Sequence, residues 1–295
     1  MRAKLGGVVA LVVLLQLGNG ALRPVVAQGT TFEWSGSNRV PPLTLTAAGA
    51  GNVNAVLFNW MWYLGMLRGP EERESVASFE LWKSTGTVQV AGQPCKLKNY
   101  RASINYQIPG MRVQYECTLP NGQSRKAIEV VSGQFAWDED VLGAGLVPGK
   151  GNATPRPDAL NERLTRLWAS PWGAPKSAAA GRPTTKVAVE GGKPVVTFPL
   201  PGPPGAMAKA TLNPENQTER VEVRQGQGVT EFVYENYGDW NPEDDKVQGY
   251  TPGHIVEKRD GVTVLDLNVA ETEVGNLYVV VPVPQSVRDA WVRKP

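Results

Sequence analysis

Apolar residues recur at helical spacing in one segment near the N-terminal end of the chain. In residues 53–68, apolar side chains return every three or four positions, and further large side chains widen that face until it runs nearly all round. We expect Asn52 or Asn54 to cap the start of this helix and Gly69-Pro70 to end it. A helix that is apolar on most sides is usually buried, so we expect other elements to cover it.

A second helix is predicted over residues 157–169, "PDALNERLTRLWA", where Asp158 is a candidate N-cap. Its apolar stripe is formed by Leu160, Leu164, Leu167 and Trp168. Before it lies a loop rich in Gly and Pro, residues 141–157, and after it a second loose connection, residues 169–185. The composition of these flanks favours a helix set between loops.

From about residue 76 the apolar positions alternate with a period of two, which is typical of strands. Turn-forming pairs such as Asn121-Gly122 and Asp260-Gly261 separate these runs. The runs are residues 78–92, 101–108, 111–119, 125–137, 185–191, 193–200, 207–214, 218–226, 230–240, 254–261, 262–274 and 278–284. Consecutive strands with short turns form antiparallel sheets, so we predict a mainly β, α+β fold with one sheet and two helices.

The composition and the first residues indicate an exported protein. The 32 Gly and 24 Pro suit a turn-rich β fold. Arg2 and Lys4 precede the apolar run 8–17, and residues 25–27 are small, so we predict a signal peptide over residues 1–27 and a single domain over residues 28–295. An uncleaved membrane anchor is the alternative interpretation.

Removal of residues 1–27 takes away three basic residues, of the 30 in the chain, and no acidic ones. The mature net charge is then 27 minus 28, or −1. Such a balance does not indicate nucleic acid or an anionic membrane as a partner. We expect a periplasmic or secreted protein that is not an integral membrane protein once processed. In that compartment Cys95 and Cys117, the only cysteines, can form a disulfide; two reduced, buried thiols are the alternative.

The sequence holds no recognised catalytic motif. His254 is the only histidine, and a metal site needs three or four ligands. A weak calcium-like pattern exists in Asp239, Asn241, Glu243 and Asp245, but its sixth and twelfth positions do not fit a calcium loop. A pair of carboxylates for glycoside hydrolysis remains an alternative, because nothing selects two of Glu80, Glu116, Glu129, Asp138 and Asp266. We expect no enzyme activity and no cofactor.

Several segments resemble a bacterial periplasmic family. They are "VVSGQFAW", "ERLTRLWASPWG", Tyr237-Gly238-Asp239, Tyr250-Thr251-Pro252, "HIVEKRDGVTVLDLNV" and "VPVPQSVR". The family is similar to the region that precedes secreted metallo-β-lactamase-fold hydrolases, and the resemblance spans roughly residues 75–288. It implies the layout of the lipoprotein-carrier (LolA-like) fold, a curved antiparallel half-barrel with two helices packed in its concave mouth. The hydrolases need several His ligands, and this chain has one, so we expect no such hydrolase site in it.

Together these features predict a protein that binds a hydrophobic ligand, such as lipid or the acyl chains of a lipoprotein, in the mouth of the sheet. The alternative is that the two helices simply fill the mouth as core, and that the protein is an accessory that docks on a partner enzyme. A hollow mouth would favour the first function, and a filled mouth with an exposed apolar patch elsewhere the second. The candidate ligand-binding residues are Trp60, Met61, Trp62, Tyr63, Met66, Leu164 and Trp168.

Overall fold

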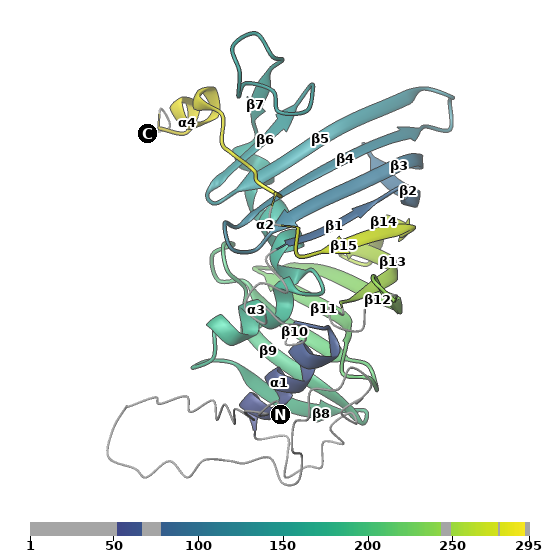
Figure 1. The fold of residues 1–295 in the computed structure, drawn as a ribbon, viewed down its shortest axis with the longest axis vertical. Helices are drawn as coiled ribbons and strands as arrows, with labels where there is room; N and C mark the ends of the chain where they lie inside the picture. Colours follow the sequence, from purple (N-terminus) through teal and green to yellow (C-terminus); the bar gives the residue numbers. More distant parts are fainter. Residues whose placement is uncertain (1–51, 67–77, 243–248, 277, 293–295) are drawn as a thin grey trace, which may run out of the picture. The chain divides into compact units, whose positions relative to one another are not determined.

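The computed structural model describes residues 52–66, 78–242, 249–276 and 278–292, and within them one antiparallel sheet dominates (Figure 1). Its fifteen strands follow the order β7-β6-β5-β4-β3-β2-β14-β13-β12-β11-β10-β9-β8, and β1 and β15 pair with each other beside β3. The sheet is open and curved, which confirms the predicted half-barrel of the α+β class. The strands are β1 Ser78–Trp82, β2 Thr85–Val90, β3 Gln93–Asn105, β4 Gly110–Thr118, β5 Ser124–Ser132, β6 Phe135–Glu139, β7 Ala153–Pro155, β8 Lys186–Glu190, β9 Lys193–Pro199, β10 Met207–Leu212, β11 Thr218–Gln225, β12 Gly228–Asp239, β13 Tyr250–Arg259, β14 Val262–Asn268 and β15 Glu271–Val274.

Two long apolar runs that the sequence presents as single strands are each broken in the middle. The first run divides into β1 and β2 at Lys83, whose backbone has a φ of 53°. The second divides into β14 and β15 after Asn268. The two breaks face each other in the sheet, because Trp82 pairs with Glu271 and Thr85 with Asn268. Both runs of residues are therefore interrupted at the same place in the sheet. Next to it lies the unbroken β3, which pairs with β2 at one end and with β1 at the other.

The inner face of the sheet carries the apolar side chains and the helices. We use "inner face" for the face that presents Phe79, Ile104 and Ile255, and "outer face" for the opposite one, which presents Arg101 and His254. The helices are α1 Val53–Tyr63, α2 Leu160–Ala169, α3 Gly173–Ala180 and α4 Gln285–Val292, with the short 3-10 helix η2 Pro157–Ala159 before α2. In Figure 1, α1, α2 and α3 lie along one side of the sheet. One continuous core joins them to the inner-face side chains.

Helix α1 is buried along one face, whereas Phe58 is 38% exposed, so the expected burial on most sides is found only in part. The indole of Trp60 is fully buried, donates its Nε1 hydrogen to the Thr218 hydroxyl at 2.9 Å and packs on the ring of Phe198. Trp172, which precedes α3, donates from its indole nitrogen to the carbonyl of Leu64 at 3.2 Å. These polar contacts fix the helix in one orientation, because each indole N–H satisfies a specific acceptor in the core.

The end of α1 corrects the prediction that the helix extends to residue 68. The Asn52 side chain caps its start by accepting from the backbone of Ala55 at 3.1 Å, but α1 ends at Tyr63. Gly65 adopts a φ of 82°, and the amides of Gly65 and Met66 bond back to the carbonyls of Trp62 and Met61. This is the Schellman arrangement, which needs a residue in the left-handed conformation, and Gly supplies it. Gly69-Pro70 lies outside the described residues.

Helix α3 falls in residues 169–185, where a loose connection was predicted. Gly173, Pro175 and four alanines give the segment no clear apolar stripe, so its helical form comes from burial against α1, α2 and β9. Asp158 was also predicted wrongly: α2 has no side-chain cap, and the Asp158 carboxylate instead accepts from Arg156.

The predicted strand over residues 278–284 is absent from the described part of the chain. Pro282 and Pro284 lack the N–H that a sheet ladder needs, and the segment crosses the ends of the strands to reach α4. There Val281 and Val287 pack on Val130 and Trp137 in a second, smaller core.

Between β3 and β4, Cys95 and Cys117 form a disulfide.

Candidate functional site

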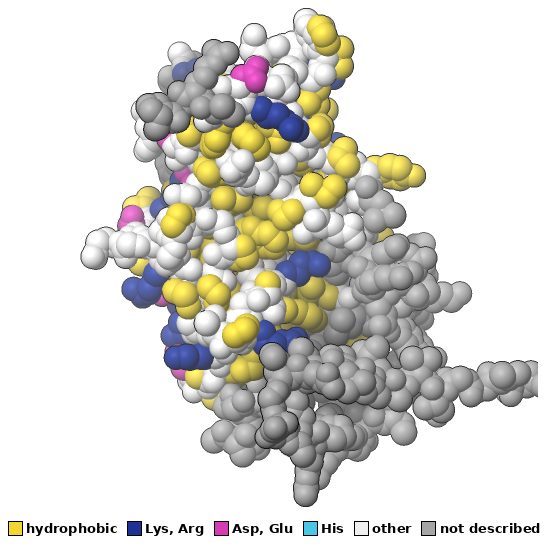
Figure 2. Space-filling view, turned by 90° about the vertical axis from the view of Figure 1, so that its left-hand side faces the viewer, with side chains coloured by type: hydrophobic (Ala, Val, Ile, Leu, Met, Phe, Trp, Pro, Cys, Tyr) yellow, Lys and Arg dark blue, Asp and Glu magenta, His cyan; other side chains and the backbone are white. Residues whose placement is uncertain are grey.

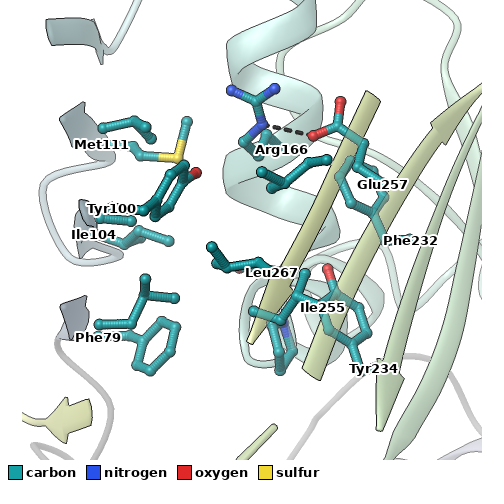
Figure 3. Close-up of a pocket in the computed structure, with 16 residues that line it drawn as sticks. Phe79, Tyr100, Ile104, Met111, Arg166, Phe232, Tyr234, Ile255, Glu257 and Leu267 are labelled. Carbon is teal, nitrogen blue, oxygen red and sulfur yellow. Dashed lines mark hydrogen bonds and ion pairs between the residues drawn. The ribbon is translucent and has the colours of Figure 1, made fainter. Parts of the chain in front are cut away.

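A small cavity lies between the inner face of the sheet and the C-terminal half of α2 (Figure 3). Figure 3 shows that side chains from β1, β3 and β4 face side chains from β12, β13 and β14 across the gap, with Arg166 of α2 at one end. Its lining is Phe79, Leu81, Tyr100, Ala102, Ile104, Met111, Val113, Arg166, Ser170, Pro171, Phe232, Tyr234, Ile255, Glu257, Leu265 and Leu267. Most of these groups are apolar, so the cavity suits an apolar occupant better than a polar one.

The size of the cavity answers whether the mouth of the sheet is hollow. Its volume is about 50 Å³, which leaves room for no more than a few water molecules. Pockets that hold a small ligand usually have about 300–1,000 Å³. In this arrangement, therefore, the helices and the side chains of the inner face nearly fill the mouth, and a larger occupant needs α2 or its neighbours to move.

A charged cluster on one wall attaches α2 to the sheet. Arg166 donates from Nε to Glu257 Oε2 at 2.8 Å, and its Nη1 lies 3.5 Å from Glu129 Oε2. Glu257 is 2% exposed, and its other oxygen accepts from Arg259 at 2.7 Å. Arg259 also pairs with Glu162 of α2 at 2.7 Å. The two arginines and three glutamates thus join α2 to β5 and β13.

Mutual attraction keeps Glu257 and Arg166 ionised although burial opposes their charges. For Glu257, burial favours the neutral acid, but Arg166 and Arg259 outweigh it and hold the pKa below its usual value. For Arg166, burial disfavours the cation, but Glu257 outweighs it and raises the pKa. Burial, together with the nearby Glu129, raises the pKa of Tyr115 to about 12. Glu257 and Arg166 therefore stay charged at neutral pH.

Three polar contacts attach the C-terminal end of α2 to the sheet and the core. Tyr234 donates its hydroxyl to the carbonyl of Ala169 at 2.8 Å, and the hydroxyls of Tyr106 and Ser170 lie 2.8 Å apart. The Thr218 hydroxyl donates to the carbonyl of Pro171 at 3.0 Å. The end of α2 is consequently anchored by hydrogen bonds.

The seven residues predicted to bind a ligand lie outside the lining of this cavity. Trp60, Tyr63 and Met66 are buried around α1, where Met61 and Trp62 are partly buried. Leu164 is buried and contacts Gly202, and Trp168 is partly buried with its ring 6.4 Å from that of Tyr106. The structure brings α1 and α2 into one core, and ligand contact by these seven residues stays a prediction.

The weak calcium-like pattern is only partly visible. Glu243 and Asp245 lie outside the described residues. The Asp239 carboxylate accepts from the backbone amides of Asn241 and Gly249 at 3.1 and 3.4 Å. This oxygen therefore already stabilises the local turn, as aspartates do in Asx turns.

The carboxylates considered as a hydrolytic pair each have a basic partner. In order, the pairs are Glu80 with Arg101, Glu116 with Lys98 and Lys126, Glu129 with Arg166, Asp138 with Arg156 and Arg163, and Asp266 with His254. Of the five, only Glu129 contacts a residue that lines the cavity. No two of the five are thereby selected as a pair, and a hydrolytic pair stays an alternative.

Sequence reasoning did not find Arg166 and Glu257, and one signal could have led to the latter. Strand β13 alternates, and Ile255 and Glu257 share its inner face. A glutamate on an otherwise apolar strand face must find a cationic partner when it is buried. The partner lies 91 residues earlier in the chain, on α2, and only the fold places it there.

The fold and the cavity define the class as an open, curved antiparallel half-barrel with helices packed on its inner face. The chain matches no family model and no curated protein. It is similar to a crystal structure of a domain from Vibrio parahaemolyticus that carries the provisional name outer membrane lipoprotein-sorting protein domain. The TM-score is 0.42 and the sequence identity 8%, over 78% of this chain and 95% of that one. Among the helices that the structure describes, none has the length and apolar character needed to cross a bilayer.

Proposed function

We propose that this protein is exported and binds a hydrophobic ligand, such as a lipid or the acyl chains of a lipoprotein, between the inner face of its sheet and α2, without catalysing a reaction. The observation that carries the proposal is the apolar lining of the cavity, not its present size: at about 50 Å³ the mouth is nearly filled, so the proposal requires the mouth to open. The cavity is lined mainly by apolar side chains from six strands, and one wall is a helix end held by hydrogen bonds and ion pairs.

Binding in this site requires α2 to move away from the sheet. The sheet strands are fixed by continuous backbone pairing, whereas α2 is joined to them largely through side chains, among them Arg166, Tyr234 and Tyr106. Such contacts break individually, so the helix is the part that can yield. An acyl chain would then replace the side chains that now fill the mouth, and its apolar surface would be removed from water.

The proposal is tested with the neutral probe 1,6-diphenylhexatriene, which fluoresces strongly only in an apolar site. The mature protein should enhance its fluorescence, and dodecanoate or dodecanol should displace it. Ala102 lines the cavity and is 5% exposed, so Ala102→Phe should reduce binding by filling the space. Ala188→Phe on the exposed edge strand β8 is the matched control. Thermal unfolding of both variants reports whether the fold is kept.

Probe binding that is absent from the protein, or unchanged in Ala102→Phe with an intact fold, would argue against this site. Mass spectrometry of the ligand after incubation tests the non-enzymatic part of the proposal. The ligand should be recovered with its mass unchanged, and a new product would show that the protein is an enzyme.

A second candidate function is docking on a partner protein, such as an enzyme, and the nearly filled mouth together with an exposed apolar patch favours it. Ile108, Tyr278 and Val280 are 68%, 91% and 58% exposed. Asn105 holds them together, because its side chain accepts from the Ile108 amide and donates to the Val279 carbonyl. A photo-crosslinking residue at Val280 should capture one partner in cells that the same residue at the exposed Val262 does not.

A further inference from the structure

Lys176 of α3 is partly buried and has no carboxylate partner within the described part of the chain. The other Lys and Arg side chains described there either form an ion pair or are exposed to solvent. Moving a cation out of water without a counter-ion costs free energy. The desolvation of Lys176 also lowers its pKa, and no acidic group offsets the effect. The charged form of Lys176 is therefore unfavourable at this position unless an anion binds beside it.

An aromatic ring, that of Tyr106, lies beside the Lys176 ammonium. Its Nζ lies 5.7 Å from the centre of the Tyr106 ring, within the range of a cation–π contact. The Tyr106 ring is 6.4 Å from that of Trp168. An aromatic ring attracts a cation only weakly. The side of the ammonium that faces away from the ring stays open to an anion. The contact thus holds the ammonium in place without neutralising it.

A short path leads from the cavity to Lys176. Ser170 lines the cavity, its hydroxyl is 2.8 Å from that of Tyr106, and the Tyr106 ring in turn contacts Lys176. Tyr106 and Ser170 thus connect the wall of the cavity to the cation through side-chain contacts. For the end of an elongated molecule in the cavity to reach the ammonium, the buried Tyr106 side chain has to move.

The face of the molecule on the side of α3 shows few acidic side chains (Figure 2). Figure 2 looks from the side on which Figure 1 shows α3 and α4, and apolar side chains there are interspersed with Lys and Arg, while few Asp and Glu side chains are visible. Among the unpaired cations of the described chain, the exposed ones are already stabilised by water. Lys176 is the one that gains most from a bound anion, because desolvation strengthens the attraction.

We propose that Lys176 binds the anionic head group, a carboxylate or a phosphate, of an amphiphile whose apolar chain occupies the cavity beneath α2. This inference rests on the proposed function and specifies its ligand class. A lone carboxylate or phosphate ion has the same charge but no chain, so it should bind far more weakly than the amphiphile. Lys176 is a binding residue in this proposal and takes no part in a reaction.

The test compares two ligands with the same chain, dodecanoate and dodecanol, by displacement of diphenylhexatriene from the mature protein at pH 7. Lys176→Met should weaken dodecanoate binding about tenfold, since a charge-assisted hydrogen bond is lost, and change dodecanol binding by less than about twofold. Lys176→Arg, which keeps the charge, should retain most of the dodecanoate affinity. Lys186→Met removes an exposed, unpaired lysine of β8 and is the control for net charge.

Each result separates the two proposals. If neither ligand displaces the probe from the wild-type protein, the proposed function fails and this inference fails with it. If both ligands bind and Lys176→Met affects neither, or affects both equally, the cavity binds chains and the role of Lys176 is refuted. If acetate or inorganic phosphate competes with dodecanoate at similar concentrations, the site takes free anions, which overturns the assignment of an amphiphile. Thermal unfolding of Lys176→Met confirms that the variant is folded.

Discussion

Replacement of Arg166 by Met tests whether the charged cluster holds α2 on the sheet. The guanidinium is the group that joins the helix to the buried Glu257, which is 2% exposed. Removing one partner of a buried ion pair usually costs about 3–5 kcal/mol, because the other charge stays buried. Arg259 still donates to Glu257 at 2.7 Å, so we expect the lower end, a loss of about 3 kcal/mol in the free energy of unfolding at pH 7.

The double variant Arg166→Met, Glu257→Met separates the ion pair from the packing. Replacing both charged partners by apolar groups of similar size is often neutral, because no charge is then left buried. The double variant should therefore be about 2 kcal/mol more stable than Arg166→Met alone. A double variant as unstable as the single one would show that the packing of Arg166, and not its charge, carries the effect.

The pH dependence gives an independent sign. In the wild-type protein the pKa of Glu257 is below its usual value, so the stability it contributes is present above about pH 4.3 and is lost as pH falls through the lower, folded-state pKa. In Arg166→Met, burial should outweigh the remaining attraction and raise that pKa. The variant should then gain more stability than the wild-type protein as pH falls from 7 towards 5, because protonation of His254 adds the same gain to both and that of Glu257 adds a gain to the variant alone.

Urea unfolding followed by tryptophan fluorescence measures these differences, and the chain has nine tryptophans. Arg224→Met is the control, because Arg224 pairs with Glu222 at an exposed site and its loss should cost less than about 1 kcal/mol. A loss below 1 kcal/mol for Arg166→Met, or a variant that loses stability as pH falls to 5, would refute the reasoning.

Three further predictions concern other parts of the sheet. Asp266 and Glu235 raise the pKa of His254 through hydrogen bonds, so protonated His254 stabilises the protein fully below about pH 6.5 and ever less as pH rises through the raised pKa. His254→Gln should therefore reduce the change with pH, between pH 6 and 8, in the free energy of unfolding measured with urea. Gly86→Ala should lower stability by about 3 kcal/mol or more in thermal unfolding, because its Cβ would lie 2.0 Å from a backbone oxygen, whereas Gly92→Ala in open space should cost about 1 kcal/mol. Removing the disulfide with Cys95→Ala and Cys117→Ala should cost about 3 kcal/mol, and the wild-type protein should gain 2 Da on reduction in intact-mass measurement.

Local sequence patterns predict most of the strands and two of the helices. Alternation in stretches such as 111–119 and 218–226 corresponds to strands β4 and β11, because side-chain direction in a strand depends only on neighbouring residues. Local chemistry also explains why α1 ends before Gly65, which takes the left-handed conformation that ends a helix. The sequence contains this glycine as well as Gly69-Pro70, and the earlier of the two signals ends the helix. Helix α3, in contrast, has no stripe that could have revealed it, since packing on all sides selects its conformation.

The alternation and turn residues of the sequence determine by themselves that this chain forms an antiparallel sheet with an apolar face, and the composition of residues 53–63 determines that α1 must be buried. Only the tertiary structure decides how full that face is and which charges meet on it. The cavity exists where β1, β3 and β13 curve around the end of α2, and Arg166 meets Glu257 across 91 residues of sequence. Volume and charge pairing depend on the distances between segments far apart in the chain, and no local pattern encodes those distances.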